Sequence, residues 1–379
     1  MLEPLNAIQL SVKVTIMKNV FLLVMWLSVA VSTVYAQDDS EKNNAADKKF
    51  EIGGISISAG ETYRGTLKVP KGEDNVETFI PITVHHGNNT GPVLSLISGI
   101  HGSEYAPILS MQRLAGLIDP RKLSGTLIIV HVANIPAFTA RTVYVSPNDL
   151  KNLNRAFPGN ANGTVTERIA STLKTEVILR SDYVVDIHAG DANEGLRPSY
   201  TAYYAEAGGN DVIEKSKRIA IAFGLGTIVK FSGSYQSIDD AIYTSAQAVT
   251  LGIPAIDIES GELGKTDDQY ITPIVEGAQN IMRELKMIKG DLNLPEQPLF
   301  INNRARVYSS HDGIFYADPK VKTGDYISKG TRLGIITDYH GTELETVDAP
   351  SAGVLLILFG TPPVNEGDNI AVIGKISEL

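Results

Sequence analysis

Short apolar runs alternate with longer segments of helical spacing through most of the chain. Apolar side chains that recur every three or four residues predict a helix, whereas short β-branched runs predict strands. The expected strands cover residues 80–85, 93–97, 126–132, 183–187 and 255–258. The expected helices cover residues 106–118, 166–180, 211–223 and 275–285. This alternation predicts an α/β sheet covered by helices on both faces.

The pattern changes near Asp291, where two nearby prolines end the helical signal. From residue 299 to the end, short strands are separated by glycine turns and no helix is expected. We therefore expect a principal domain over residues 50–296 and a small all-β domain over residues 297–379.

Three segments of this small domain resemble the barrel-sandwich fold of biotinyl and lipoyl domains: Gly313–Phe315, 321–330 and 349–354. A carrier domain of that kind needs a lysine at an exposed hairpin tip, and Thr346–Pro350 has none. We therefore expect a scaffold that is suited to cap an active-site mouth or to contribute to an oligomer interface.

The N-terminal region has the pattern of a secretory signal peptide. Lys18 precedes an apolar run from Val20 to Val31, and Val34 and Ala36 provide the small residues before a cleavage site. We expect a signal peptide over residues 1–36, with Met17 as an alternative start, and a polar linker over residues 37–49. The protein would then be periplasmic or secreted. An uncleaved anchor is the alternative, although the apolar run is short for a membrane span.

Composition narrows the chemistry. The chain has no cysteine, which excludes disulfides, thiolate ligands and cysteine nucleophiles. Any metal must therefore be held by His, Asp and Glu. The formal net charge of −10 argues against nucleic acid as a partner, because phosphate binding needs a basic surface.

A candidate metal site begins where the strand 93–97 runs into the segment Gly99–Glu104. His101 and Glu104 follow the strand end and precede a helix, which is where open α/β sheets bind ligands. Spacing of i and i+3 lets imidazole and carboxylate converge on one ion. His188 also follows a buried strand and is the best candidate for a third ligand.

A His-Glu-His set with one open position is typical of a catalytic zinc site. Asp186 or Asp191 is suited to orient a ligand imidazole. The other histidines are interpreted as structural or surface residues: His85, His86, His131, His311 and His340.

Four segments together resemble the succinylglutamate desuccinylase/aspartoacylase family, which is related to the zinc carboxypeptidases. They are 99–104, 152–159, 186–188 and 257–261, and their order and spacing match. The resemblance runs from about Phe50 to the end. It implies a zinc-carboxypeptidase-like mixed sheet flanked by helices, with a C-terminal β domain.

The resemblance also implies residue roles. One zinc ion would be bound by His101, Glu104 and His188. Glu259 would act as the general base, taking a proton from the attacking water and passing it to the leaving amine. Glu262 is a rival for that role, because both residues follow the strand 255–258.

The resemblance places the substrate carboxylate on Asn154 and Arg155, since a guanidinium matches a carboxylate in a bidentate way. Arg141 would polarise the scissile carbonyl and stabilise the oxyanion. This sequence departs from the aspartoacylase pattern in two places: Asn152 stands where that pattern has Asp, and the gap between Arg141 and Asn154 is longer. Four tyrosines are candidate liners of the rest of the pocket: Tyr200, Tyr203, Tyr204 and Tyr235.

We therefore expect a zinc-dependent deacylase acting on an N-acyl amino acid or a similar small carboxylate. Two alternatives stay open at this point. One is a zinc carboxypeptidase acting on peptides, and the other is a non-catalytic carboxylate-binding protein. A homo-oligomer is compatible with all three.

Overall fold

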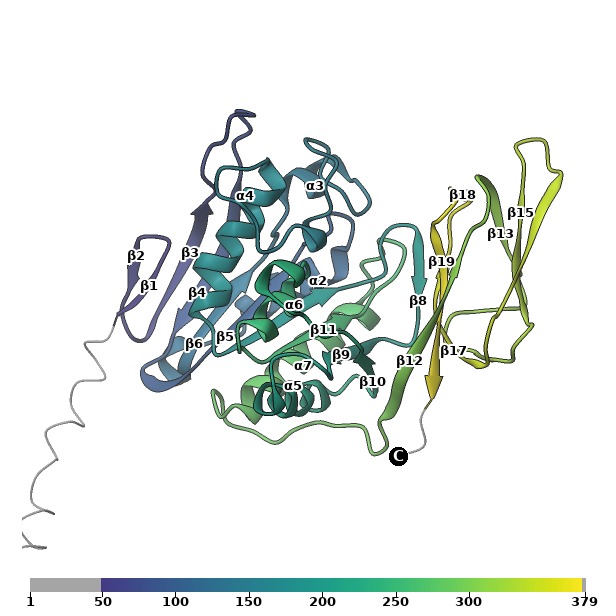
Figure 1. The fold of residues 1–379 in the computed structure, drawn as a ribbon. Helices are drawn as coiled ribbons and strands as arrows, with labels where there is room; N and C mark the ends of the chain where they lie inside the picture. Colours follow the sequence, from purple (N-terminus) through teal and green to yellow (C-terminus); the bar gives the residue numbers. More distant parts are fainter. Residues whose placement is uncertain (1–48, 377–379) are drawn as a thin grey trace, which may run out of the picture. The chain divides into compact units, whose positions relative to one another are not determined.

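A thirteen-stranded sheet runs through the part of the chain that this computed structural model describes, residues 49–376 (Figure 1). The expected signal peptide and residues 37–48 of the expected linker lie outside the described residues. Twelve strands follow the order β14-β17-β19-β12-β10-β9-β11-β7-β5-β6-β4-β3, and β8 pairs with β17.

Residues 61–259 supply nine strands of this sheet: β3 (Glu61–Lys68), β4 (Phe79–His86), β5 (Asn89–Ser98), β6 (Ser124–Val130), β7 (Tyr183–His188), β8 (Glu194–Leu196), β9 (Tyr200–Tyr204), β10 (Thr227–Phe231) and β11 (Ala255–Glu259). The helices are α2 (Tyr105–Ala115), α3 (Ile135–Ala140), α4 (Val165–Thr172), α5 (Asn210–Phe223), α6 (Thr244–Thr250) and α7 (Asp268–Glu284). A separate hairpin joins β1 (Phe50–Ile52) to β2 (Ile55–Ile57).

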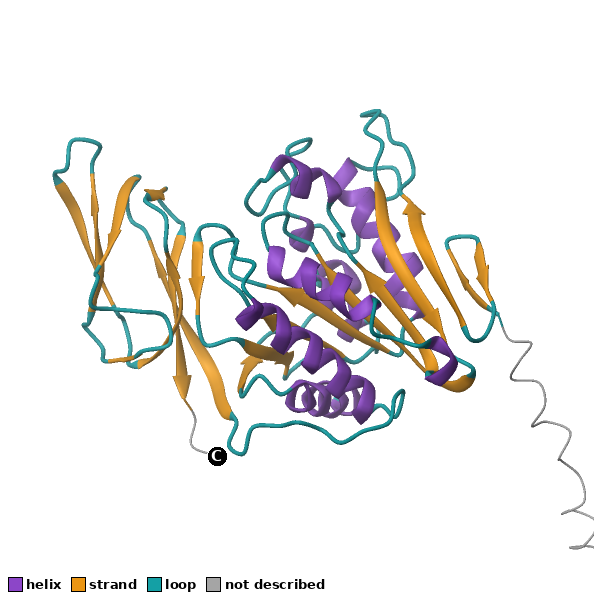
Figure 2. Cartoon of the chain, turned by 180° about the vertical axis from the view of Figure 1, so that it is seen from behind, coloured by secondary structure: helices purple, strands orange, loops and turns teal. Residues whose placement is uncertain are grey.

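Alternation along the strands produces two cores, one on each face of the sheet. Leu94 and Leu96 of β5 pack in a cluster with residues of α2, α5 and α7. Ile97 of the same strand, with Ile128 of β6, packs in the other cluster, which contains residues of α4 and α6. Figure 2 shows helices on both sides of the sheet strands. The expected mixed α/β class is therefore confirmed.

Three expected helices differ in the structure. The second, expected over residues 166–180, is α-helical only as far as Thr172 and continues as a π-helix (Leu173–Val177) and a 3-10 helix (Ile178–Arg180). The first ends at Ala115 rather than at residue 118, because Gly116 caps it and Leu117 is exposed. The last begins at Asp268 rather than at residue 275. Pro273 lies inside α7, where it removes one backbone donor. The buried side chains of Ile271 and Ile274 on either side of it favour the helix nonetheless.

The C-terminal part contains only strands among its described residues, as expected. They are β12 (Leu299–Tyr308), β13 (Gly313–Ala317), β14 (Tyr326–Ile327), β15 (Arg332–Thr337), β16 (Glu343–Asp348), β17 (Gly353–Phe359), β18 (Pro363–Val364) and β19 (Asn369–Ile376). Four of them form a separate antiparallel sheet, in the order β16-β15-β13-β18. The others join the large sheet, because β12 pairs with β10 in parallel through Thr227 and Leu299.

Within residues 49–376, no helix has both the length and the apolar character that a membrane crossing requires.

Candidate metal and active site

The loop after β5 carries the first two predicted ligands. Ser98 ends β5 and its hydroxyl donates to the carbonyls of Val130 and His131, which fixes the strand end against β6. Gly99 then turns with a φ of +70°, a backbone conformation that suits glycine. This places His101 and Glu104 between the end of β5 and the start of α2.

His188 and Glu259 come from the neighbouring strands of the sheet. His188 is the last residue of β7, and Glu259 is the last residue of β11. The two strands are parallel, and these two residues are direct partners in the register. The carboxyl ends of β5, β7 and β11 therefore meet at one edge, which is the expected location of a site in an α/β sheet.

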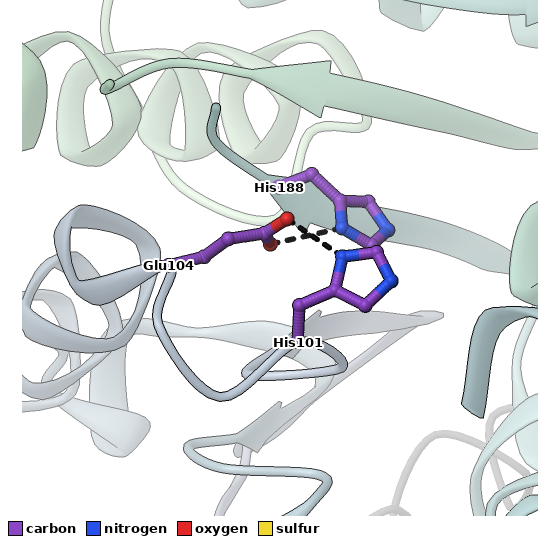
Figure 3. A group of neighbouring side chains, drawn as sticks. All are labelled: His101, Glu104 and His188. Carbon is purple, nitrogen blue, oxygen red and sulfur yellow. Dashed lines mark hydrogen bonds and ion pairs between the residues drawn. The ribbon is translucent and has the colours of Figure 1, made fainter. Parts of the chain in front are cut away.

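The structure brings the three predicted metal ligands together (Figure 3). His101 Nδ1 lies 2.7 Å from Glu104 Oε1, and His188 Nδ1 lies 3.0 Å from Glu104 Oε2. The three ligand atoms lie within 4.8 Å of one another, and all three residues are buried. Two imidazoles and one carboxylate in this arrangement fit a tetrahedral divalent cation with an open fourth position.

The electrostatics of this group are tightly linked. Burial alone would raise the pKa of Glu104, but the imidazoles of His188 and His101 outweigh it and lower that pKa to about 2. Burial opposes the charged form of His188, yet the carboxylates of Asp186 and Glu104 raise its pKa well above the ordinary value. Three buried titratable groups thus depend on one another for charge compensation.

A second layer orients the imidazole rings. Asp186 Oδ2 lies 3.0 Å from His188 Nε2, and Asn152 Oδ1 lies 3.1 Å from His101 Nε2. An acceptor at Nε2 keeps the proton there and leaves the Nδ1 lone pair directed at the centre of the site. Asp191 accepts a hydrogen bond from Ser103 and lies 3.8 Å from His101 Nδ1, so it contributes less to orientation.

A cavity of about 730 Å³ opens onto this group, and Glu259 lines it. The Glu259 carboxylate makes no hydrogen bond or ion pair with any residue in the described part of the chain. Burial raises the pKa of Glu259 well above its ordinary value, although the nearby His188 opposes that rise. The rival Glu262 does not line the cavity, because it is bonded to Arg197, Lys265 and Tyr270.

The predicted substrate-binding pair also lines the cavity. Asn154 lies in a 3-10 turn over Leu153–Arg155, and its Oδ1 accepts from the backbone N–H and the hydroxyl of Thr244. The Arg155 guanidinium lies over the ring of Tyr243, 4.4 Å from its centroid. Its Nη1 donates to the carbonyl of Asn154. The other guanidinium donors remain available to a ligand.

Arg141 is not brought to the cavity. It is exposed at the end of α3, with a φ of +59°, and it is not among the residues that line the cavity. The sequence already indicated this departure from the aspartoacylase pattern, because the gap between Arg141 and Asn154 is longer than in that pattern. The geometry therefore gives no support to the role in oxyanion stabilisation that the resemblance implied.

Three of the four tyrosines expected to line the pocket do so, and the alternation of side chains along β9 explains the exception. Tyr200 and Tyr204 of β9 point to the same face and line the cavity, as does Tyr235. Tyr203 points to the opposite face and packs in the core with α5 and α7.

Several lining residues were missed from the sequence, namely Tyr144, Glu194, Lys230, Arg304 and Arg306. Tyr144 donates to Glu194 Oε1 at 2.6 Å and packs edge-on against His101. The others come from β8, β10 and β12, and no local pattern shows that these strands lie beside the site.

Comparisons with known proteins agree with this geometry. Residues 90–285 match the sequence profile of the succinylglutamate desuccinylase/aspartoacylase catalytic domain. The chain is similar to the N-alpha-acetyl-L-2,4-diaminobutyric acid deacetylase of Halomonas elongata. The two are 29% identical over 338 residues, which cover 86% of this chain and 94% of that protein.

Two solved structures extend the likeness to the whole described fold. The product-bound ectoine utilization protein EutE (DoeB) of Ruegeria pomeroyi has a TM-score of 0.74 at 27% identity, covering 83% of this chain and 95% of that one. A succinylglutamate desuccinylase from a Silicibacter species has a TM-score of 0.73 at 26% identity, with the same coverage. From the matched profile, which spans more than half of the sequence, the chain belongs to the succinylglutamate desuccinylase/aspartoacylase family, a family of deacylases.

Proposed function

We propose that this protein is a zinc-dependent deacylase that hydrolyses the amide bond of an N-acyl amino acid or a similar small carboxylate. One observation carries the proposal. The buried His101–Glu104–His188 group opens onto the same cavity as the unbonded carboxylate of Glu259 and the guanidinium of Arg155. A metal site, a base and a carboxylate receptor are the parts that hydrolytic deacylation needs.

Zinc is the ion that fits two imidazoles and one carboxylate best, and when bound it would supply a Lewis acid and lower the pKa of water. The chain's own residues supply the rest. Glu259 is placed beside His188 by the strand register and accepts the proton of the attacking water. It then passes that proton to the leaving amine. Because no residue in the described range 49–376 bonds to the Glu259 carboxylate, it stays free for both transfers.

Arg155 and Asn154 orient the substrate. The stack on Tyr243 holds the Arg155 guanidinium in one plane, which suits bidentate binding of a carboxylate. Asn154 Nδ2 lies 3.3 Å from His188 Nε2. Because the Asp186 carboxylate lies closer to that nitrogen, at 3.0 Å, the Asn154 N–H groups stay available to the substrate. Tyr144, beside His101, is better placed than Arg141 to face the scissile group.

Metal content and turnover together test this function. The purified mature protein, from Gln37 onward, should hold about one zinc per chain, and His188→Ala should lose most of it. Glu259→Gln should keep the zinc but lose activity on N-acyl amino acids by about a thousandfold or more.

Other results would redirect the proposal. Full zinc occupancy in His188→Ala would remove His188 from the ligand set. Release of free C-terminal residues from peptides would favour a carboxypeptidase. Ligand binding that is identical in wild type and Glu259→Gln, with no turnover in either, would favour a carboxylate-binding protein.

We further propose a periplasmic or secreted location. The support is the sequence alone: Lys18, the apolar run from Val20 to Val31, and the small residues Val34 and Ala36. The N-terminal residue of the protein isolated from cells would test it, with Gln37 as the expected result.

A further inference from the structure

One oxygen atom joins the predicted metal site to the predicted carboxylate-binding turn. Asn152 Oδ1 lies 3.1 Å from His101 Nε2 and accepts the backbone N–H of Asn154 at 2.8 Å. Asn152 is the N-cap of the 3-10 turn that carries Asn154 and Arg155. A backbone N–H can only donate, so the amide is held with its oxygen toward both groups. Asn152 therefore fixes a metal ligand and the carboxylate-binding turn at the same time.

The two predicted ligand imidazoles meet acceptors of different charge. His188 Nε2 lies 3.0 Å from the buried carboxylate of Asp186. His101 Nε2 meets the neutral amide of Asn152 instead. A carboxylate acceptor makes an imidazole more basic than an amide does, and a more basic imidazole is a stronger metal ligand. His101 is thus the weaker of the two imidazole ligands, because of the residue at position 152.

The fold does not require a neutral residue at this position. Aspartate caps a helical turn as well as asparagine does, and its carboxylate accepts the same two hydrogen bonds. The consequence of neutrality lies in the cavity, which Asn152 and Arg155 both line. A carboxylate at position 152 would share that cavity with the substrate anion that Arg155 binds, and the two like charges would repel each other.

We propose that Asn152 is a positioning residue that couples the metal site to the carboxylate-binding turn. Its neutrality lowers the affinity for zinc and raises the affinity for the substrate carboxylate. This inference rests on the proposed function, because it takes zinc and an N-acyl amino acid as the two ligands. The competing role for Asn152 is that of a simple turn cap, in which asparagine and aspartate would be equivalent.

Zinc affinity measures the first half of the proposal. Competition with a chelator of known affinity would compare the mature protein with its Asn152→Asp and Asn152→Ala variants. Asn152→Asp should bind zinc about tenfold more tightly, because His101 then donates to a carboxylate. Asn152→Ala removes the shared acceptor and should bind zinc about tenfold less tightly.

Ligand affinity measures the second half. Calorimetric titration of N-acetyl-L-alanine into the metal-loaded Glu259→Gln protein reports binding without turnover. Asn152→Asp, added to that protein, should weaken binding by about fivefold or more, because like charges then share the cavity wall. Asn152→Ala should also weaken it, because the turn loses its cap. Aspartate thus moves the two affinities in opposite directions, whereas alanine lowers both.

Asn160→Asp is the matched control. Asn160 Oδ1 accepts the backbone N–H of Asn162, two residues further along, at 3.0 Å, as Asn152 Oδ1 does from Asn154. Asn160 is exposed and is not among the residues that line the cavity. The variant adds the same charge to the same kind of turn and should leave both affinities unchanged.

The outcomes separate this inference from the proposed function. Unchanged zinc and ligand affinities in Asn152→Asp would leave Asn152 as a turn cap and overturn the inference. So would a change of both affinities in the same direction, or no binding of N-acetyl-L-alanine to any form. Asn152→Asp decides the question by itself if Asn152→Ala fails to fold.

Turnover then places each proposal. If wild type hydrolyses N-acyl amino acids although the inference is overturned, the deacylase proposal stands alone. If the two affinities separate as expected and no N-acyl amino acid is hydrolysed, the coupling through Asn152 stands and deacylation does not.

Discussion

Glu259 and Glu262 lie three residues apart, yet their surroundings are opposite. Glu262 Oε1 lies 2.7 Å from the Tyr270 hydroxyl, 2.9 Å from Lys265 Nζ and 3.2 Å from Arg197 Nη2. Burial alone would raise its pKa, but these three donors outweigh burial and lower that pKa to about 2. Glu262 is therefore a structural ion-pair centre, and Glu259 is left as the free carboxylate.

Glu262→Gln should destabilise the protein in a pH-dependent way. The folded-state pKa lies below the ordinary value of 4.5, so the ionised group stabilises the fold above pH 4.5 and loses this effect as the pH falls toward 2. We expect a loss of about 2 kcal/mol in the free energy of unfolding at pH 7. The difference from wild type should shrink at pH 3. Urea unfolding at both pH values measures it.

The turnover number of Glu262→Gln provides the control for this assignment. It should stay close to that of wild type, because Glu262 does not line the cavity. A large loss of turnover with unchanged stability would instead identify Glu262 as the base.

At this scale the sequence predicted the residues that follow strand ends. His101, Glu104 and His188 could be found because parallel strands end at a common edge, and Glu259 was implied by the family resemblance. Arg304 could not, because its place depends on strands more than 70 residues apart in the chain.

The loop between β5 and α2 shows how one element positions the metal ligands. Gly102 stands between His101 and Glu104 and lies against α3. A Cβ atom on Gly102 would come within 2.3 Å of the Ala137 carbonyl carbon and 2.5 Å of the Phe138 nitrogen. These are backbone atoms, so neither can move aside alone. The loop can keep its place only with glycine here.

Gly102→Ala should therefore displace the loop and its two ligands. We expect zinc affinity to fall by about tenfold or more, measured by competition with a chelator of known affinity. Gly116→Ala is the matched control. Its Cβ would meet only the Arg113 carbonyl oxygen, at 3.5 Å, and its φ is −79°. Equal zinc affinity in both variants would show that the loop tolerates the shift.

The longer elements of the principal domain were predictable, whereas the short helices α3 and α6 and the strands β1 to β3 and β8 to β10 were not predicted. The apolar periodicity located α2, α5 and the strands β4 to β7. It placed the start of α7 too late, because Pro273 lowers the local helix propensity. The helix nevertheless begins earlier, since Ile271 and Ile274 bury their side chains in the core. Helix propensity depends on nearby residues alone, whereas burial against the sheet depends on residues far away in the sequence and can override it.

At the scale of the whole molecule, the question is how the chain is joined across residue 296, the expected domain boundary. The sheet continues across that position, since β10 pairs with β12. One core cluster also contains residues from both sides: Leu196, Tyr200, Ala202 and Val229 with Ile301, Val354, Leu356 and Val372. The change in pattern near Asp291 is visible in the sequence, but the pairing that bridges it is not, because parallel pairing has no local signature. The expected boundary therefore stays a prediction that unfolding can test.

Leu356→Ala probes this coupling. Leu356 is fully buried in the same cluster as Tyr200, whose strand pairs beside Glu259. We expect a loss of about 3 kcal/mol, typical of a buried leucine replaced by alanine. If the shared sheet couples the two parts, circular dichroism and loss of deacylase activity should report the same urea midpoint. Both measurements should then show a lower midpoint in the variant than in wild type.

Leu344→Ala, at a side chain that is 41% exposed, should leave that midpoint unchanged. Independent parts would give two transitions, with the activity midpoint unmoved by Leu356→Ala, because the predicted catalytic residues all precede residue 297.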